Sequence, residues 1–213
     1  MNGIIWGYDP GGNCNHGLAM LDVRDKQIVA AECWTLDTAQ SAISRILGER
    51  QPLGIGVDTL TEWSSVKSGW RIADDLLRRN YKGAKSSVAS PNSLRGSMVI
   101  NGMALILAVR NKWPSTVVSE THPKVLCLAL SNKAYGKNTL HRRNTALVGW
   151  QGIPALTKLP ENDDEWDALA SAYSLWAGII GLWPENLHAR SRDDDSIVRP
   201  AGYTAYFWPK ALP

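Results

Sequence analysis

The sequence lacks the features that would assign it to a secreted, zinc-binding or membrane-spanning class. Its 213 residues contain only three cysteines, which are odd in number and share no C-x-x-C spacing, so neither a disulfide framework nor a zinc site is expected. The N-terminus lacks the charged and then apolar pattern of a signal peptide. The apolar run at residues 103–109 is much shorter than the roughly 20 residues that cross a bilayer. A cytoplasmic protein without membrane contact is therefore expected.

Internal repeats and flexible linkers are also absent. We therefore expect one domain, residues 1–213, in which residues 184–213 form a wrapping C-terminal tail rich in proline, tryptophan and charged groups. An apolar content of 44% is enough for a sizeable core. The net charge of +3 permits a nucleic-acid partner but does not by itself indicate one.

Short apolar runs and amphipathic segments alternate along the chain. Strands are expected at residues 3–8, 17–23, 28–35, 53–57 and 116–119, and helices at 39–48, 70–79, 93–110 and 162–180. Asp37 is the expected N-cap of the first helix, and Asn162 or Asp163 that of the last. A hairpin turn joins the second and third strands, and helical crossovers join the later ones. This order predicts an α/β fold: a mixed five-stranded sheet, with an antiparallel hairpin of the first three strands and two parallel crossover strands, flanked by helices.

Acidic residues follow three of the predicted strands. Asp9, Asp58 and Glu120 each come directly after an apolar strand, and the ends of parallel neighbours converge at one edge of a sheet. Bringing these charges together is costly unless a cation compensates them, and hard oxygen ligands suit Mg²⁺ or Mn²⁺. Any one of them could instead form a turn, as Asp9 before Pro10 suggests. Three at equivalent places favour a metal site.

The last predicted helix carries a further group of acids. Asp167 lies at the border of its apolar stripe, where a carboxylate can point toward a neighbouring cleft. Asp163 and Asp164 lie in the first turn, where acids also stabilise the helix dipole. For these two residues both interpretations stay open.

These segments resemble a known superfamily. The segments 7–12 and 17–19 resemble the first two strands of ribonuclease H-like nucleases, and are especially similar to RuvC-type Holliday-junction resolvases. Residues 164–170 resemble the closing helix of those enzymes, with two acids three positions apart before Ala-Leu-Ala. The chain resembles more closely a family of predicted nucleases, number 429 among the domains of unknown function. This closer resemblance is carried by Val57-Asp58, by Arg71, Asp74 and Arg78, by Glu120-Thr121-His122-Pro123, and by Asp167-Ala168-Leu169.

The resemblance implies a ribonuclease H-like fold and a metal-dependent nuclease site. Asp9, Asp58 and Asp167 would be both catalytic and metal-binding. Glu120, an added acid of the closer family, would also be catalytic and bind the metal, and Asp164 would join as a metal ligand. RuvC-type enzymes usually carry glutamate where this chain has the shorter Asp58, which changes the expected metal spacing. A junction enzyme would also need a homodimer with two sites, although no segment identifies a dimer face.

Several basic residues and one histidine are candidates for supporting roles. The predicted supporting or substrate-binding residues are His122, Arg71, Arg78, Lys137, Arg142 and Arg143. His122 could orient Glu120, or it could begin a helix beside Pro123. Arg71 and Arg78 could bind phosphate or form intrahelical ion pairs. The later basic segment could position a nucleic-acid backbone or form a solvated face.

Three functions are compatible with these features. The leading hypothesis is a Mg²⁺- or Mn²⁺-dependent nuclease that hydrolyses phosphodiester bonds in DNA or RNA through a two-metal-type acidic site. The second is a non-catalytic module on the same fold that binds nucleic acid or protein. The third is an actin-like ATPase, which would need a second glycine-rich phosphate loop that the sequence does not offer.

Overall fold

A mixed five-stranded sheet forms the centre of the molecule. The computed structural model describes residues 1–12, 14–67, 69–89, 96–131 and 160–212. The strands are β1 (Gly3–Asp9), β2 (His16–Arg24), β3 (Gln27–Leu36), β4 (Gly54–Val57) and β6 (Val117–Glu120), in the order β3-β2-β1-β4-β6. The first three are antiparallel neighbours, and β1, β4 and β6 run parallel. This arrangement confirms the predicted mixed sheet, with an antiparallel part formed by the first three strands and two parallel crossover strands.

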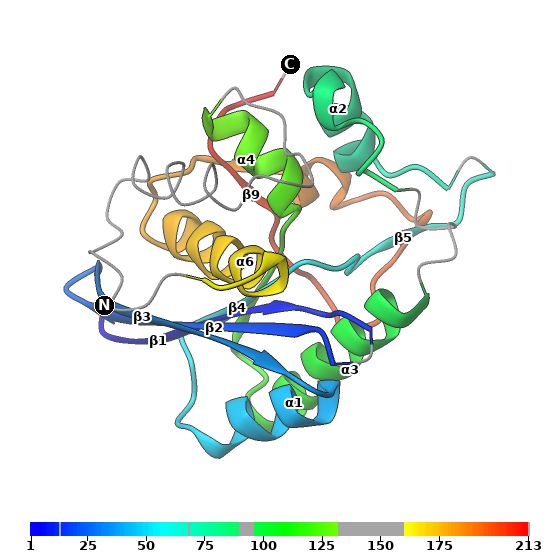
Figure 1. Cartoon of the computed structure of the whole chain (residues 1–213). Coiled ribbons are helices and arrows are strands. Elements are labelled where there is room, and N and C mark those ends of the chain that lie inside the picture. Colours follow the sequence, from blue (N-terminus) through cyan, green and yellow to red (C-terminus); the bar gives the residue numbers. More distant parts are fainter. Residues whose placement is uncertain (13, 68, 90–95, 132–159, 213) are drawn as a thin grey trace.

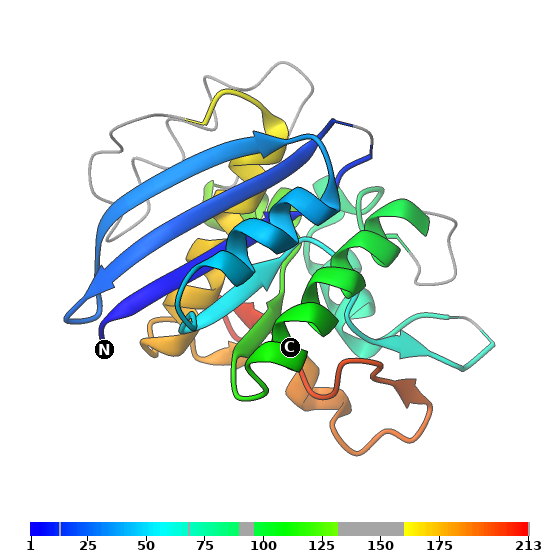
Figure 2. The same ribbon diagram turned by 90° about the horizontal axis from the view of Figure 1, so that it is seen from below.

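Helices cover both faces of the sheet (Figure 1). Helices α1 (Ala39–Gly48) and α3 (Gly96–Lys112) lie on one face, which is also seen from below in Figure 2. Helix α6 (Asp163–Ile179) lies on the other face, on the same side as α2 (Ile72–Asn80) and α4 (Pro123–Ser131). Side chains in β1 alternate between two buried clusters, with Trp6 and Tyr8 facing α1 and α3 and Ile5 facing α6.

The helix N-termini follow local side-chain chemistry. Helix α1 is capped by Thr38, whose hydroxyl accepts a hydrogen bond from the backbone N–H of Ser41. The prediction of Asp37 as this cap was therefore wrong by one residue. Asn162 caps α6 by accepting from the backbone N–H of Glu165, as predicted.

The C-terminal segment packs against the core as short elements. These are β7 (Glu185–Asn186), a 3₁₀ turn η2 (Leu187–Ser191), β8 (Ile197–Val198) and β9 (Phe207–Trp208). Strand β8 pairs with β5 (Trp63–Ser64), and β7 pairs with β9. A second 3₁₀ turn, η1 (Lys82–Ala84), follows α2. In the part of the chain that the structure describes, no helix has the length and hydropathy that crossing a bilayer requires.

Helix α6 lies directly against the backbone of the sheet because glycines replace side chains at the contacts. A Cβ atom built on Gly7 would lie 1.9 Å from the carbonyl oxygen of Ala168, and one on Gly56 would lie 2.0 Å from that of Ser171. On β2, a Cβ on Gly17 would lie 1.9 Å from the carbonyl oxygen of Asp164. Any side chain at these strand positions would push the helix away. These glycines therefore fix the distance between α6 and the strand ends.

Candidate metal centre

Three aspartates from three separate elements meet at the edge of the sheet. Asp9 ends β1, Asp58 directly follows β4, and Asp167 lies in the second turn of α6. One carboxylate oxygen from each lies within 4.8 Å of the others. Asp9 is 6% exposed and Asp167 is 2% exposed, whereas Asp58 is half-buried. The structure thus brings together three of the residues predicted as metal ligands.

The strand register explains why these carboxylates meet. Gly7 pairs with Gly56 across β1 and β4, and each glycine stands two residues before an aspartate. Because side chains alternate along a strand, both aspartates project from the same face as the glycines, toward α6. The backbone of α6 touches Gly7 at Ala168, the residue after Asp167. Helix α6 therefore places the carboxylate of Asp167 beside the ends of β1 and β4.

The cluster is electrostatically unfavourable without a cation. Burial raises the pKa of Asp9 well above its usual range, and the nearby charges of Asp58, Asp167 and Asp164 raise it further. Lys124 acts in the opposite direction. Carboxylate oxygens are the donors that Mg²⁺ and Mn²⁺ prefer, and a divalent cation would offset the repulsion. The donor set and its charge therefore fit such an ion.

Two further charged residues stand beside the cluster. The Nζ atom of Lys124, in the first turn of α4, lies 3.9 Å from Oδ2 of Asp167. Sequence reasoning missed Lys124, although it directly follows the Glu-x-His-Pro segment on which the family resemblance rests. Asp164 is half-buried and near enough to influence Asp9, but it lies outside the group of three carboxylates.

The structure places Glu120 away from this cluster. Tyr8 pairs with Val57 and Val57 pairs with Glu120, so Glu120 is one residue out of phase with the aspartates and projects from the opposite face. Arg71 donates hydrogen bonds to both of its carboxylate oxygens, at 2.6 and 2.8 Å. Thr61 donates to Oε2 through its backbone N–H and its hydroxyl. The expectation that Glu120 contributes to the metal cluster does not match this placement.

Glu120 is held as a carboxylate by its neighbours. Burial alone would raise the pKa of Glu120, but the Arg71 guanidinium outweighs burial and, with His188, holds that pKa well below its usual range. The residue is 2% exposed. Glu120 is therefore a buried, ionised carboxylate that is stabilised by groups within the protein.

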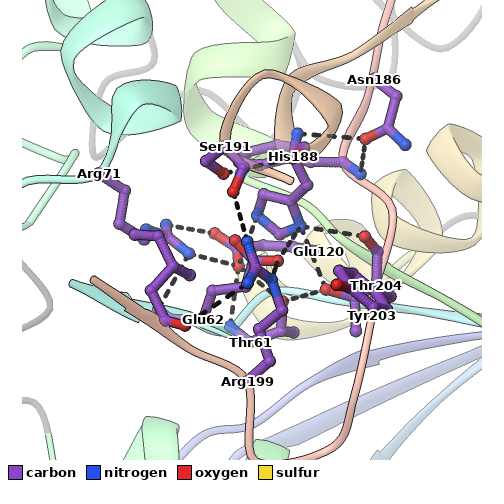
Figure 3. Close-up of polar contacts among 12 residues, drawn as sticks. Thr61, Glu62, Arg71, Glu120, Asn186, His188, Ser191, Arg199, Tyr203 and Thr204 are labelled. Atoms are coloured by element: carbon purple, nitrogen blue, oxygen red, sulfur yellow. Dashed lines mark hydrogen bonds and ion pairs between the residues drawn. The ribbon is translucent and has the colours of Figure 1, made fainter. Parts of the chain in front are cut away.

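Arg71 and Glu120 belong to a buried polar network, shown in Figure 3. Arg71 donates to Asp74 at 2.7 and 2.9 Å and to the backbone carbonyl of Glu62 at 3.2 Å. With its two bonds to Glu120, all five guanidinium N–H groups are used. Arg71 is thus occupied by protein groups, and the hypothesis that it grips phosphate is not supported. Its bond to Asp74 matches the intrahelical alternative.

The C-terminal segment closes the other side of the network. His188 places Nε2 3.5 Å from Glu120 Oε2 and Nδ1 3.7 Å from Glu62 Oε1. Arg199 donates to Glu62 Oε1 at 2.9 Å. The pattern of the sequence contained no signal for this arrangement, because its members are spread from residue 61 to residue 204.

The remaining supporting candidates have structural partners or lie outside the described residues. Arg78 donates to the backbone carbonyls of Lys85 and Val88 and stacks its guanidinium on Trp70. His122 immediately precedes α4, and its Nε2 lies 2.9 Å from the carbonyl oxygen of Ser87. Burial lowers the pKa of His122 to about 4, so the ring is neutral at physiological pH. Lys137, Arg142 and Arg143 lie outside the described residues.

Comparisons with known proteins find similarity among solved structures. No family model matches the chain, so membership of family number 429 stays a prediction, and no curated protein matches it. Among solved structures, the chain is similar to Thermus thermophilus RuvC, with 17% identity, a TM-score of 0.45, and 84% of this chain and 96% of that chain covered. T. thermophilus RuvC in complex with a Holliday junction substrate gives 16% identity, a TM-score of 0.42 and the same coverage.

Proposed function

We propose that the protein is a nuclease that hydrolyses phosphodiester bonds in nucleic acid and depends on Mg²⁺ or Mn²⁺. The observation that carries this proposal is the cluster of Asp9, Asp58 and Asp167, whose oxygens lie within 4.8 Å of one another. Two of the three carboxylates are buried, and their mutual repulsion has no structural benefit of its own. Such arrangements are typical of functional sites.

The three aspartates would hold the cation through their oxygens. When bound there, a divalent cation lowers the pKa of an attacking water and stabilises the charge that develops on the phosphate. Asp58 is the most exposed of the three and is therefore the one that faces the substrate. Lys124 is 42% exposed along its side chain, and its ammonium group stands at the same edge. We assign it the role of binding a phosphate oxygen, which draws the backbone of the substrate toward the cluster.

The test is cleavage of labelled DNA and RNA by the wild-type protein and by Asp9→Asn. We expect hydrolysis that requires Mg²⁺ or Mn²⁺ and stops on chelation. The rate of hydrolysis should fall by at least about a hundredfold in the variant, because the loss of one ligand weakens binding of the ion and disturbs its position. Asp25→Asn is the matched control, since Asp25 is exposed, has φ of +49° and lies in the β2–β3 turn, where asparagine is equally suited. Full activity of a folded Asp9→Asn protein would contradict the proposal. Binding of nucleic acid that survives Asp9→Asn, without hydrolysis by the wild type, would identify a binding module instead.

A further inference from the structure

A pocket of about 190 Å³ opens beside the aspartate cluster. Asp58 and Lys124 belong to its wall, so the pocket and the cluster share one boundary. The residues that line another part of it are apolar and include Val88, Met98 and Val99. Arg71 and its carboxylate partners form part of the polar wall. The pocket thus combines an apolar side with polar groups and ends at the proposed reaction site.

The volume suits one small aromatic ring. A cavity of about 150 Å³ in a protein core accepts benzene, so a slightly larger pocket accepts a ring of pyrimidine size together with its polar substituents. An intact duplex cannot present a base to such a pocket, because its bases are stacked and paired. A base that is turned out of the stack, or that was never paired, can enter.

The wall of the pocket also carries polar residues on one side. These include Asp58, Thr59 and Ser87. The edge of a nucleobase carries hydrogen-bond donors and acceptors, so a pocket with one apolar and one polar side suits a base.

We propose that this pocket holds one unstacked nucleobase of the substrate, next to the phosphate at the aspartate cluster. The inference rests on the proposed nuclease function and adds the class of substrate, which is nucleic acid with an unpaired nucleotide at the cleavage site. Lys124 stands where pocket and cluster meet and holds the phosphate between them. Paired duplex binds at least about tenfold more weakly, because one base must first be unpaired and unstacked.

The experiment is a four-way comparison of binding. The probes are a fluorescent oligothymidylate and an abasic strand of equal length, with affinities measured by fluorescence anisotropy in Ca²⁺. Val99→Trp extends a large ring into the pocket from α3, and Ala104→Trp is the control on the exposed surface of the same helix, since Ala104 does not line the pocket. We expect Val99→Trp to weaken binding of oligothymidylate about tenfold, in line with the contribution of one stacked base, and Ala104→Trp to change it less than about twofold. The two tryptophan variants should bind the abasic strand equally, because losing the base and filling the pocket remove the same interaction.

Each outcome decides the proposal. Equal binding of oligothymidylate by Val99→Trp and Ala104→Trp would overturn the base pocket, and if the wild type still cleaves nucleic acid in a metal-dependent manner, the proposed nuclease function stands alone. If the wild type neither binds nor cleaves either strand, both proposals fail. If Val99→Trp does not fold, Ala89→Leu, which fills the pocket from a different segment, takes its place with the same expected result.

Discussion

Replacing Asp9 with asparagine should make the metal-free protein more stable. The carboxylate oxygens lie within 4.8 Å of one another, and two ionised groups at that limit repel each other by about 3.5 kcal/mol at an effective dielectric constant of about 20. Asparagine has nearly the same shape and removes the charge that Asp58 and Asp167 oppose. Part of this repulsion is already relieved in the wild type by proton uptake, because the pKa of Asp9 is raised. We therefore expect a gain of about 1–3 kcal/mol in the free energy of unfolding at pH 8.

The gain should depend on pH in a defined direction. Between the ordinary pKa of an aspartate, near 3.8, and the raised pKa of Asp9, the native state holds a proton that the unfolded state has lost. The free energy of unfolding of the wild type therefore falls relative to that of Asp9→Asn as pH rises through this window. Urea unfolding in EDTA, at several pH values from 4 to 8, measures the difference.

Metal should reverse the order of stability. Mn²⁺ at a thousand times its dissociation constant stabilises a protein that binds it by about 4.1 kcal/mol, which exceeds the advantage of the metal-free variant. The wild type should gain this amount and Asp9→Asn should gain much less. Asp25→Asn should follow the wild type throughout. A metal-free Asp9→Asn protein that is less stable than the wild type by 1 kcal/mol or more would refute the reasoning, since the cluster would then be a stabilising feature and not a repulsive one.

Three further predictions concern the surroundings of the cluster. Arg71→Met should lower the free energy of unfolding by about 3–5 kcal/mol in urea denaturation, because it leaves two buried carboxylates without their cationic partner. Arg79→Met breaks an exposed ion pair and should lower it by less than about 1 kcal/mol in the same assay. Gly7→Ala should weaken Mn²⁺ binding in calorimetry and lower the free energy of unfolding by about 1–3 kcal/mol, because its Cβ would meet the backbone of α6. A Cβ at Gly48 has open space, so Gly48→Ala should leave Mn²⁺ binding unchanged. As pH drops from 6.5 to 4, His122 should lower the free energy of unfolding by up to about 3 kcal/mol, because it titrates in the unfolded state but stays neutral in the native state. The difference in free energy of unfolding between the wild type and His122→Asn should change by this amount over the same range, and a constant difference would contradict the assignment.

The sequence predicted the sheet well because the relevant signals are local. Apolar runs that end in turn residues identified β1 and β4, and the order of elements then determined the antiparallel and parallel parts of the sheet. Asp9 and Asp58 could be placed together for the same reason. Asp167 was found from its position at the border of the helix stripe, and it lies in the cluster.

Glu120 shows where this reasoning fails. It follows its strand as the two strand aspartates do, but the strand register decides which face a side chain takes, and a shift by one residue reverses it. Its partners Arg71 and His188 come from segments that only the folded chain brings together. One local signal was present. Glycine precedes each of the two strand aspartates by two positions, whereas Val118 stands two positions before Glu120.

The most direct test of the account is a crystal soaked in Mn²⁺ and measured at a wavelength where manganese scatters anomalously. The account predicts an anomalous difference peak between Asp9, Asp58 and Asp167, at carboxylate oxygen distances typical of a hard divalent cation, roughly 2.0–2.3 Å. It predicts no peak at Glu120, whose oxygens are taken by Arg71 and Thr61. A saturated crystal that shows no peak at the three aspartates, or a peak coordinated by Glu120 instead, would contradict the proposed metal centre.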